Sequence, residues 1–359
     1  MTIRRQLVNF GSTCTDFRIG SGLLDELPRI LKNVVGSPKR AHAVISPGTE
    51  PHVREAVRRA LADAGFTISI TEAEDPSVEC ALDIMRDLAR AGITSDDLVL
   101  GIGSTSACSL SIWCSRSWCS GTACVLIPTE LDGMASLATG MVPLSCADAP
   151  GRVSVQPHVD MVACDLDLVS GLPVDRAGLG YTVIVRSALS ESRRVWDKLA
   201  ESIDRMLEGD LIALIDLLCM CQTSRSGSIK SSSPSARSAL NFGLTTASAL
   251  KKLLGASAPW YLCVAEGMRF EARVAHDAFG LDPEVIFDQD DAFEALGVGE
   301  LAFDFKPEDL VEALRAERFR ASNRFMLPLP KFPGTVRLTT VDDDVLERHA
   351  AAFVAARRA

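Results

Sequence analysis

The stretch Asp97-Leu98-Val99-Leu100-Gly101-Ile102-Gly103-Ser104-Thr105 indicates the fold class, because a short apolar run leads directly into two closely spaced glycines and a helix start. Strand, glycine turn and helix, in this order, form the turn in which parallel sheets hold a phosphate group. The glycines allow a ligand to approach the backbone closely, and the amide groups at the helix start attract an anion. Many such turns bind nothing, so dinucleotide binding and plain turn geometry both remain open.

Short apolar runs alternate with amphipathic helices on both sides of this stretch, from residue 18 to about residue 170. The predicted strands cover 41–45, 67–70, 97–100, 123–127 and 161–165, and the predicted helices begin at Ser21, Pro51 and Ser77. This alternation is typical of a parallel sheet with helices on both faces. It predicts a Rossmann-like α/β domain over residues 1–170.

The second half of the chain follows the helical period after Leu172-Pro173. The predicted helices cover 176–189, 194–208, 211–221, 238–254, 261–279 and 344–357. The segment 224–235 is rich in serine and contains Pro234, which predicts an exposed loop. Residues 171–359 are therefore predicted to form an all-α domain, and the expected fold class is α/β plus all-α.

The composition excludes several classes of partner. The 359 residues carry 47 acidic and 37 basic side chains, a net charge of -10, whereas nucleic acids and anionic membranes need a basic surface. No run of 18 apolar residues occurs, and residues 1–6 are not signal-like. We expect a cytoplasmic protein that acts on a small molecule and binds neither nucleic acid nor membrane.

Metal chemistry is not indicated by the residue types. The chain has five histidines, no two of them at the spacing that places two ligands on one helix face, and it has no CxxC pair. We therefore expect no metal site.

Two polar segments are candidate binding sites. Pro128-Thr129-Glu130-Leu131-Asp132 follows a predicted strand, where open parallel sheets bind ligands, so its hydroxyls and Asp132 are placed to meet a ribose. A polar turn capped by Asp132 explains the same residues. Arg237 and Asn241 precede a glycine near a helix start and suit an anion pocket, although a surface arginine beside a capping asparagine is the alternative.

These segments, in this order, resemble the dehydroquinate synthase superfamily, which includes the sugar phosphate cyclases and, more distantly, glycerol-1-phosphate dehydrogenases and iron-containing alcohol dehydrogenases. The resemblance covers nearly the whole chain and rests on Gly22-Leu23-Leu24, Gly101-Ile102-Gly103, Ile127-Pro128-Thr129, Asp165-Leu166-Asp167, Leu172-Pro173, Arg176-Ala177-Gly178-Leu179, Leu240-Asn241-Phe242-Gly243 and Val264-Ala265-Glu266-Gly267-Met268. The loop Asp132-Gly133-Met134-Ala135-Ser136 instead is similar to that of glycerol-1-phosphate dehydrogenases.

The resemblance implies a nucleotide-binding N-terminal domain, a helical substrate domain with an active site in the cleft between them, and a homodimer. It implies NAD as the cofactor, held by Gly101, Gly103, Ser104, Thr105 and Thr129. Ala107 stands where the family has an aspartate, which leaves NAD binding and its absence both open. Arg237 and Asn241 match the family residues that bind the phosphate or phosphonate of the substrate.

The departures from the family lie at its chemical centre. Family members hold a catalytic zinc with one acidic residue and two histidines, and the matching positions here are Tyr181, Leu244 and Trp260. Leucine and tryptophan offer zinc no ligand atom, and a neutral tyrosine is a poor one. The family's lysine one turn beyond its acidic ligand falls at Ile184. Authentic 3-dehydroquinate synthase activity is therefore not expected.

Three functions remain open. The first is a repurposed, metal-independent enzyme, a cyclase or lyase, that acts on a small anionic metabolite in a specialised biosynthetic pathway. The second is a metal-independent NAD(P)-linked oxidoreductase, and the third is a non-catalytic binding or scaffold protein of the same fold.

For the first function, the predicted catalytic residues are Tyr181, Asp132 and Glu266, with Glu130 and His276 as further acid or base candidates. Leu244 and Trp260 would then form an apolar wall that binds substrate beside the Tyr181 phenol. Alternatively, these two residues and Tyr181 simply fill the space left by the metal as additional core.

Overall fold

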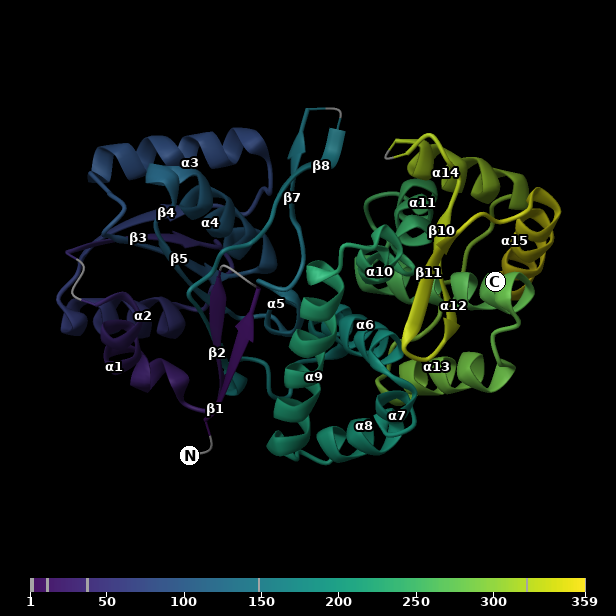
Figure 1. Cartoon of the computed structure of the whole chain (residues 1–359), viewed down its shortest axis with the longest axis horizontal. Coiled ribbons are helices and arrows are strands. Elements are labelled where there is room, and N and C mark those ends of the chain that lie inside the picture. Colours follow the sequence, from purple (N-terminus) through teal and green to yellow (C-terminus); the bar gives the residue numbers. More distant parts are fainter. Residues whose placement is uncertain (1–2, 11–12, 37–38, 148, 321, 359) are drawn as a thin grey trace. The chain divides into compact units, whose positions relative to one another are not determined.

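The computed structural model describes residues 3–10, 13–36, 39–147, 149–320 and 322–358, except the side chains of residues 33–35. The chain divides into two compact units, Met1–Leu172 and Pro173–Ala359, which we call the N-terminal unit and the helical unit (Figure 1). Residues 1–6 were used above to predict a cytoplasmic location. Residues 1 and 2 of that segment lie outside the described residues.

The N-terminal unit is built on a seven-stranded sheet with the strand order β1-β2-β9-β6-β5-β3-β4. All neighbouring strands are parallel except β1 and β2. The strands of the sheet are β1 (Arg4–Asn9), β2 (Cys14–Gly20), β3 (Arg40–Ile45), β4 (Thr67–Glu72), β5 (Leu98–Gly103), β6 (Ala123–Pro128) and β9 (Met161–Asp165). The predicted Rossmann-like parallel sheet is confirmed.

Two antiparallel hairpins of this unit were not predicted. One is β1–β2, and the other joins β7 (Val142–Cys146) to β8 (Ala149–Val155). Most residues of β1 and β8 are exposed or half-buried. Strands with so little burial lack the apolar run that marks a buried strand in a sequence.

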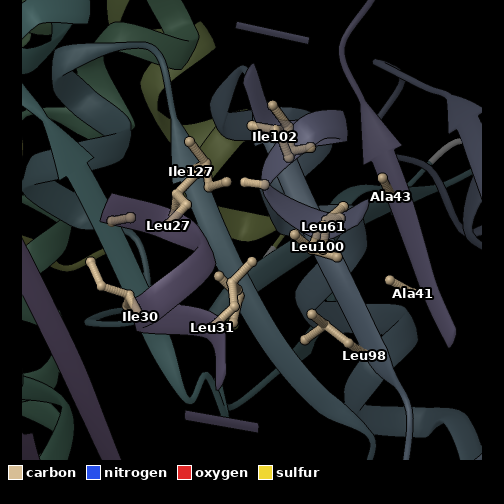
Figure 2. Close-up of a cluster of buried hydrophobic side chains, with 14 of the residues drawn as sticks. Leu27, Ile30, Leu31, Ala41, Ala43, Leu61, Leu98, Leu100, Ile102 and Ile127 are labelled. Atoms are coloured by element: carbon tan, nitrogen blue, oxygen red, sulfur yellow. The ribbon is translucent and has the colours of Figure 1, made fainter. Parts of the chain in front are cut away.

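Helices cover both faces of the sheet, and β5 shows how its residues divide between them. Leu98, Leu100 and Ile102 pack with α1 (Leu23–Val35) and α2 (Pro51–Ala64), as Figure 2 shows. Val99 packs on the opposite face with α3 (Val78–Ala91) and α4 (Thr105–Ser117). This alternation along a strand that is buried on both faces explains its continuous apolar run.

Short helical segments complete the N-terminal unit. They are η1 (Trp118–Ser120), α5 (Leu131–Ser136) and η2 (Leu166–Leu168). Serines cap the two helices on the α3–α4 face: Ser77 accepts the Cys80 amide at 3.1 Å, and Ser104 accepts the Ala107 amide at 3.3 Å. These caps start α3 and α4 where the polar residues indicated.

The helical unit is mainly α-helical. Its helices are α6 (Val174–Glu191), α7 (Arg193–Trp196), α8 (Leu199–Leu207), α9 (Leu211–Lys230), α10 (Pro234–Ser238), η3 (Ala239–Asn241), α11 (Leu244–Leu254), α12 (Trp260–Phe279), α13 (Pro283–Ala295), α14 (Pro307–Phe319) and α15 (Asp343–Arg357). It also contains a hairpin of β10 (Leu327–Phe332) and β11 (Thr335–Thr339). This hairpin was not predicted. It contains Pro328 and Pro330, which its two-stranded ribbon tolerates because each strand is an edge.

The predicted loop at 224–235 is wrong, because α9 continues to Lys230. The Ser224 hydroxyl donates to the Ser187 carbonyl on α6 at 3.0 Å, and the Ser226 hydroxyl donates to the Thr223 carbonyl at 2.9 Å. Small, buried serines thus let α9 pack on α6, so tertiary contact overrides their weak helix propensity. Only 231–233 separate α9 from α10.

The start of α11 lies very close to α12. A Cβ atom added at Gly267 would lie 2.1 Å from the Gly243 carbonyl oxygen, and Gly243 has φ = 82°. Glycine is therefore required at both positions. Because α10 and η3 occupy the preceding residues, α11 begins at Leu244 rather than at 238 as predicted.

Across the described residues, none of the helices combines the length and the apolar character that crossing a membrane would require.

Candidate functional site

The two glycines of the β5–α4 turn face protein atoms. A Cβ atom added at Gly101 would lie 2.9 Å from the Cys108 Cα and 2.8 Å from the Ser111 Oγ, both on α4. At Gly103, with φ = 107°, it would lie 2.2 Å from the Ser46 Oγ. The glycines therefore allow α4 to pack closely on β5 and admit the Ser46 side chain, which is the plain turn geometry left open by the sequence.

Two carboxyl groups lie at the N-terminus of α4. Glu130 Oε2 accepts the Thr105 amide N–H at 3.0 Å, and Asp132 Oδ2 accepts the Thr105 hydroxyl at 2.6 Å. Ser46 Oγ accepts the Ser104 amide N–H at 3.2 Å. The positive end of this helix is thus already matched by the protein's own carboxylates.

Asp132 is suited to proton transfer. It lies in the first turn of α5 rather than capping it, and is only 6% exposed. Burial and, secondarily, the nearby Glu130 charge raise its pKa to about 6, although the Thr105 hydroxyl bond opposes the shift. A carboxyl group with such a pKa exchanges its proton near neutral pH, as acid and base catalysts do.

The predicted cofactor-binding residues lie together at the carboxyl ends of β5 and β6, where the Thr129 amide donates to the Gly103 carbonyl at 2.9 Å. A pyrophosphate placed at the start of α4 would meet the Glu130 carboxylate, and like charges repel. The amides of Ser104 and Thr105 already have acceptors. This arrangement does not fit a dinucleotide pyrophosphate.

In the helical unit, the positions that correspond to the family's zinc ligands lie on three helices. Tyr181 is half-buried on α6, Leu244 is the first residue of α11, and Trp260 is the first residue of α12 and 37% exposed. Burial raises the pKa of Tyr181, so its phenol keeps its proton at neutral pH. A neutral phenol donates a hydrogen bond but binds zinc poorly.

The residues at these positions do not fit the family's zinc. Neither Leu244 nor Trp260 offers a ligand atom. Within the described ranges, no group of three or more His, Cys, Asp or Glu side chains is arranged to hold a metal ion.

A second tyrosine near Tyr181 was missed by the sequence interpretation. A Cβ atom added at Gly178 would lie 2.4 Å from the Tyr261 Cδ2, so the Tyr261 ring packs directly on α6. Gly178 precedes Tyr181 by about one turn of α6, so Tyr261, which lies on α12, packs on α6 about one turn away from Tyr181. The signal in the sequence was Gly178 itself, since a glycine inside a helix indicates close approach by a neighbour.

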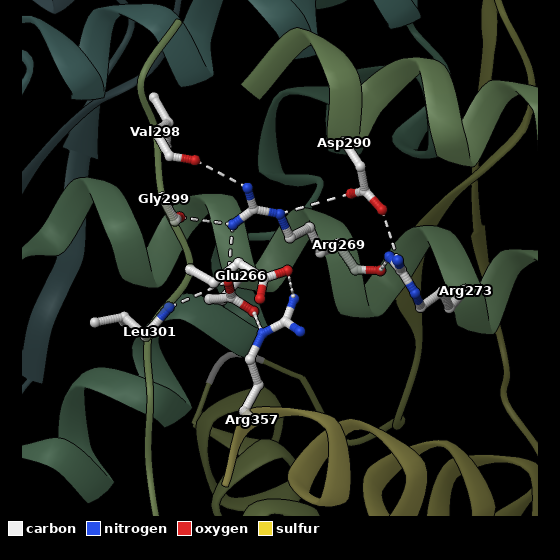
Figure 3. Close-up of polar contacts among 9 residues, drawn as sticks. Glu266, Arg269, Arg273, Asp290, Val298, Gly299, Leu301 and Arg357 are labelled. Carbon is white, nitrogen blue, oxygen red and sulfur yellow. Dashed lines mark hydrogen bonds and ion pairs between the residues drawn. The ribbon is translucent and has the colours of Figure 1, made fainter. Parts of the chain in front are cut away.

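Glu266, predicted to be catalytic, is completely buried in an ion-pair network (Figure 3). Its carboxylate accepts from Arg269 Nη1 at 2.7 Å and from Arg357 Nε at 2.9 Å. Burial raises its pKa, and the two arginines oppose that shift. Both oxygens are thus held by arginines, which describes a structural ion pair, so we leave Glu266 out of the proposed chemistry.

The other predicted polar residues have ordinary surroundings. Arg237 is exposed and donates from Nη1 to the Ser231 carbonyl at 3.3 Å, and Asn241 is exposed in η3. His276 Nδ1 lies 2.7 Å from the Leu281 carbonyl oxygen at the end of α12. Arg237 and Asn241 as substrate ligands stay a prediction.

Two buried arginines of the helical unit were missed by the sequence interpretation. Arg186 on α6 is 5% exposed and Arg225 on α9 is 8% exposed. Arg186 stands within an apolar helical run, which was the available signal, whereas Arg225 lay in the segment wrongly predicted to be a loop. Burial and, after it, the charge of Arg225 lower the pKa of Arg186 to about 9.

No family model matches the chain. Among curated proteins, it is 30% identical over 178 residues to the 3-dehydroquinate synthase of Thermobifida fusca, a match that spans 48% of this chain and 47% of that enzyme, about half its length. It is 20% identical over 351 residues to the 3-dehydroquinate synthase of Saccharolobus solfataricus, which spans 94% of this chain and 96% of that enzyme.

Solved structures share the fold at low sequence identity. A 2-deoxy-scyllo-inosose synthase complexed with carbaglucose-6-phosphate, NAD+ and Co2+ superposes with a TM-score of 0.82 at 11% identity, covering 97% of this chain and 100% of that one. The 2-epi-5-epi-valiolone synthase ValA of Streptomyces hygroscopicus subsp. jinggangensis 5008, with NAD+ and Zn2+ bound, gives 0.81 at 16% identity, covering 98% and 99%. The chain is thus similar in sequence to 3-dehydroquinate synthases and shares its fold with sugar phosphate cyclases, which supports the resemblance to the dehydroquinate synthase-like superfamily.

Proposed function

We propose that this chain is a cyclase- or lyase-type enzyme that transfers protons, without a metal, on a small anionic metabolite of a specialised biosynthetic pathway. The relatives and fold neighbours are sugar phosphate cyclases, which supports a cyclase-type role. Metal independence is supported by the poor ligand set at Tyr181, Leu244 and Trp260. A cytoplasmic homodimer is part of the proposal.

The observation that carries the proposal is the Thr105–Asp132 pair. Asp132 is buried at the carboxyl edge of a parallel sheet, where such folds place their ligands, and its pKa is about 6. As a carboxylate, Asp132 would take a proton from a carbon next to a carbonyl group. The C–H electron pair then forms a double bond while a leaving group on the next carbon departs with its bonding pair. This elimination changes no oxidation state overall and needs no hydride acceptor.

Tyr181 is the second proposed catalytic residue. Its pKa lies above the ordinary value because the side chain is half-buried, which keeps the phenol protonated. A protonated phenol donates a hydrogen bond to a developing oxyanion. Leu244 and Trp260 are proposed to contact apolar parts of the substrate.

The competing functions have unequal support. An NAD(P)-linked oxidoreductase is disfavoured by the Glu130 carboxylate at the start of α4. The second candidate is a binding protein without catalytic activity. It is supported by the Glu130 carboxylate, which disfavours NAD(P) binding, and by the poor set of zinc ligands at the family's metal positions, because both remove parts of the family's chemistry.

The test follows proton exchange by NMR in D2O over a panel of phosphorylated and carboxylated keto sugars, with chelator-treated protein. We expect Asp132→Asn to lower the exchange rate by about a hundredfold or more, and Tyr181→Phe to lower it by about a hundredfold. Because the base must be ionised, the wild-type rate should rise as pH increases through about 6.

The matched control is Asp83→Asn, which changes an exposed carboxylate on α3 whose side chain is 69% exposed. This variant should exchange protons like the wild type, and all variants should keep the wild-type melting profile at pH 5. Equal exchange by Asp132→Asn and wild type would exclude the catalytic role of Asp132. Binding of a panel compound without any exchange would favour the non-catalytic candidate.

A further inference from the structure

A pocket of about 440 Å³ lies between the short helices α7 and α8 and the first half of α9, and we call it the α7–α9 pocket. Helix α8 packs along α9 within the helical unit (Figure 1). Pockets of this volume hold small molecules in many proteins. Among the described residues that line it, none belongs to the chemistry proposed above. The α7–α9 pocket is therefore a separate feature of the helical unit.

Apolar side chains form the floor of the α7–α9 pocket. They are Val195, Leu199, Leu217 and Met220. Leu199 on α8 and Leu217 on α9 are each only 4% exposed. Trp196 holds α7 in place beside them, because its ring is buried and its Nε1 donates to the Asp288 carboxylate at 3.2 Å. The pocket thus offers a preformed apolar surface that the apolar part of a ligand can cover.

Two exposed cations at the rim of the α7–α9 pocket lack a carboxylate partner. Arg194 lies on α7, and Lys198 comes directly before α8. Neither side chain has an ion-pair partner among the described residues. With Asp216, the lining residues carry two positive charges and one negative charge, a net charge of +1.

Other exposed arginines of the same two helices do have carboxylate partners. Arg193 on α7 lies 2.6 Å from Asp197, and Arg205 on α8 lies 2.5 Å from Asp210. The whole chain carries a net charge of -10, so carboxylates are in excess over cations. Two cations without such partners beside an apolar pocket are therefore complementary in charge to an anionic ligand.

We propose that the α7–α9 pocket binds an organic anion, in which an oxyanion group, carboxylate or phosphate, is carried on an apolar body. Arg194 and Lys198 would donate charge-assisted hydrogen bonds to the oxyanion group. The apolar body would cover Leu199 and Leu217 and remove them further from water. This site goes beyond the proposed function and does not depend on it.

Calorimetric titration of the full chain with octanoate tests the site. We expect saturable binding by the wild type, with the dissociation constant raised about tenfold or more in the double variant Arg194→Gln/Lys198→Gln. Acetate lacks the apolar body and 1-octanol lacks the charge, so each should bind at least about tenfold more weakly than octanoate. Octyl phosphate, titrated in the same way, distinguishes a preference for phosphate from one for carboxylate.

The matched control is the double variant Arg193→Gln/Arg205→Gln. It removes the same number of positive charges from the same helices, but neither residue lines the α7–α9 pocket. It should bind octanoate within about twofold of the wild type. Equal weakening in the two double variants would reveal a general effect of charge and overturn the site. Absence of saturable binding of both octanoate and octyl phosphate by the wild type would overturn it as well.

Ser202→Phe tests the place of binding independently. Ser202 is half-buried on α8 and lines the pocket, and its hydroxyl donates to the Lys198 carbonyl within the same helical stretch at 2.9 Å. A phenyl ring there would occupy the pocket, so octanoate binding should be lost. Full binding by a folded Ser202→Phe would overturn the site by moving the ligand elsewhere. A melting curve checks folding, and the two double variants decide if this variant does not fold.

Discussion

The helical unit contains two sets of charged side chains whose described partners differ. The paired cluster consists of Glu266, Arg269, Arg273, Asp290 and Arg357 (Figure 3). In the paired cluster, Arg269 lies 2.7 Å from Glu266 and 3.6 Å from Asp290, and it also donates to the carbonyls of Val298 and Gly299, each at 2.9 Å. In the second set, the arginine pair of Arg186 and Arg225, Arg186 donates to the Leu240 carbonyl at 3.1 Å, and none of the described carboxylates lies within ion-pair distance of Arg186.

The two sets differ in the partners of their arginines. In the paired cluster each arginine has a carboxylate partner, although the buried Arg269 Nε has no hydrogen-bond partner. Arg186 keeps a buried Nε without a hydrogen-bond partner and has no such carboxylate partner among the described residues. Burial of charge alone would not have distinguished the two sets.

The largest expected effect comes from breaking the paired cluster. Glu266→Gln leaves Arg269 and Arg357 buried without their shared carboxylate, so the free energy of unfolding should fall by about 3–5 kcal/mol. Urea denaturation at pH 7 measures it. Glu300→Gln, which removes an exposed partner of Arg357, should change it by less than about 1 kcal/mol. Equal effects of the two variants would show that the paired cluster is not structural.

The next effect is a pH dependence at the carboxylate beside the arginine pair. Burial raises the pKa of Glu271 to about 7, which exceeds the unfolded value of about 4.5. The folded state therefore binds more protons between these pH values, so the stability contribution is complete below about pH 4.5 and falls as pH rises through 7. The loss amounts to about 3 kcal/mol.

Glu271→Gln removes this titration. Relative to the wild type, the variant should be more stable at pH 8 than at pH 5 by about 3 kcal/mol, as measured by urea denaturation at both pH values. A difference between variant and wild type that is the same at pH 5 and pH 8 would contradict the raised pKa.

The smallest expected effect is on stability in Arg186→Met. Removing a buried cation that has no ion-pair partner and faces a second cation relieves repulsion, which offsets the lost bond to the Leu240 carbonyl. The free energy of unfolding should change by about 1 kcal/mol or less, and it can rise or fall. A loss as large as that of Glu266→Gln would place Arg186 among the structural charges.

The spacing of apolar residues predicted those helices and strands whose buried positions repeat regularly along the chain. The helix predicted from Pro51 is α2, and the apolar run at 41–45 lies within β3, because each element repeats its buried positions at the period of its own backbone. The serine-rich stretch after Cys221 failed as a loop prediction, since its side chains bond across to α6. The same error concealed Arg225.

For the candidate site, residue types carried part of the prediction. Tyr181, Leu244 and Trp260 offer a poor set of zinc ligands wherever they lie, because ligand chemistry belongs to the side chain itself. From its place after a strand, Asp132 was predicted to meet a ribose, and it was named separately as an acid or base candidate for the implied cleft. Its pKa of about 6 depends on burial and on Glu130, which the sequence alone does not supply.

The sequence by itself determined the change from a parallel α/β unit to a helical unit after Pro173, since the spacing of apolar residues is a local property. Only the tertiary structure decided which charges are balanced. Glu266 meets Arg357 across 91 positions of the chain, and Glu130 meets Thr105 across 25. Such partners are chosen by how helices and strands pack, and burial then makes the presence or absence of a partner decisive.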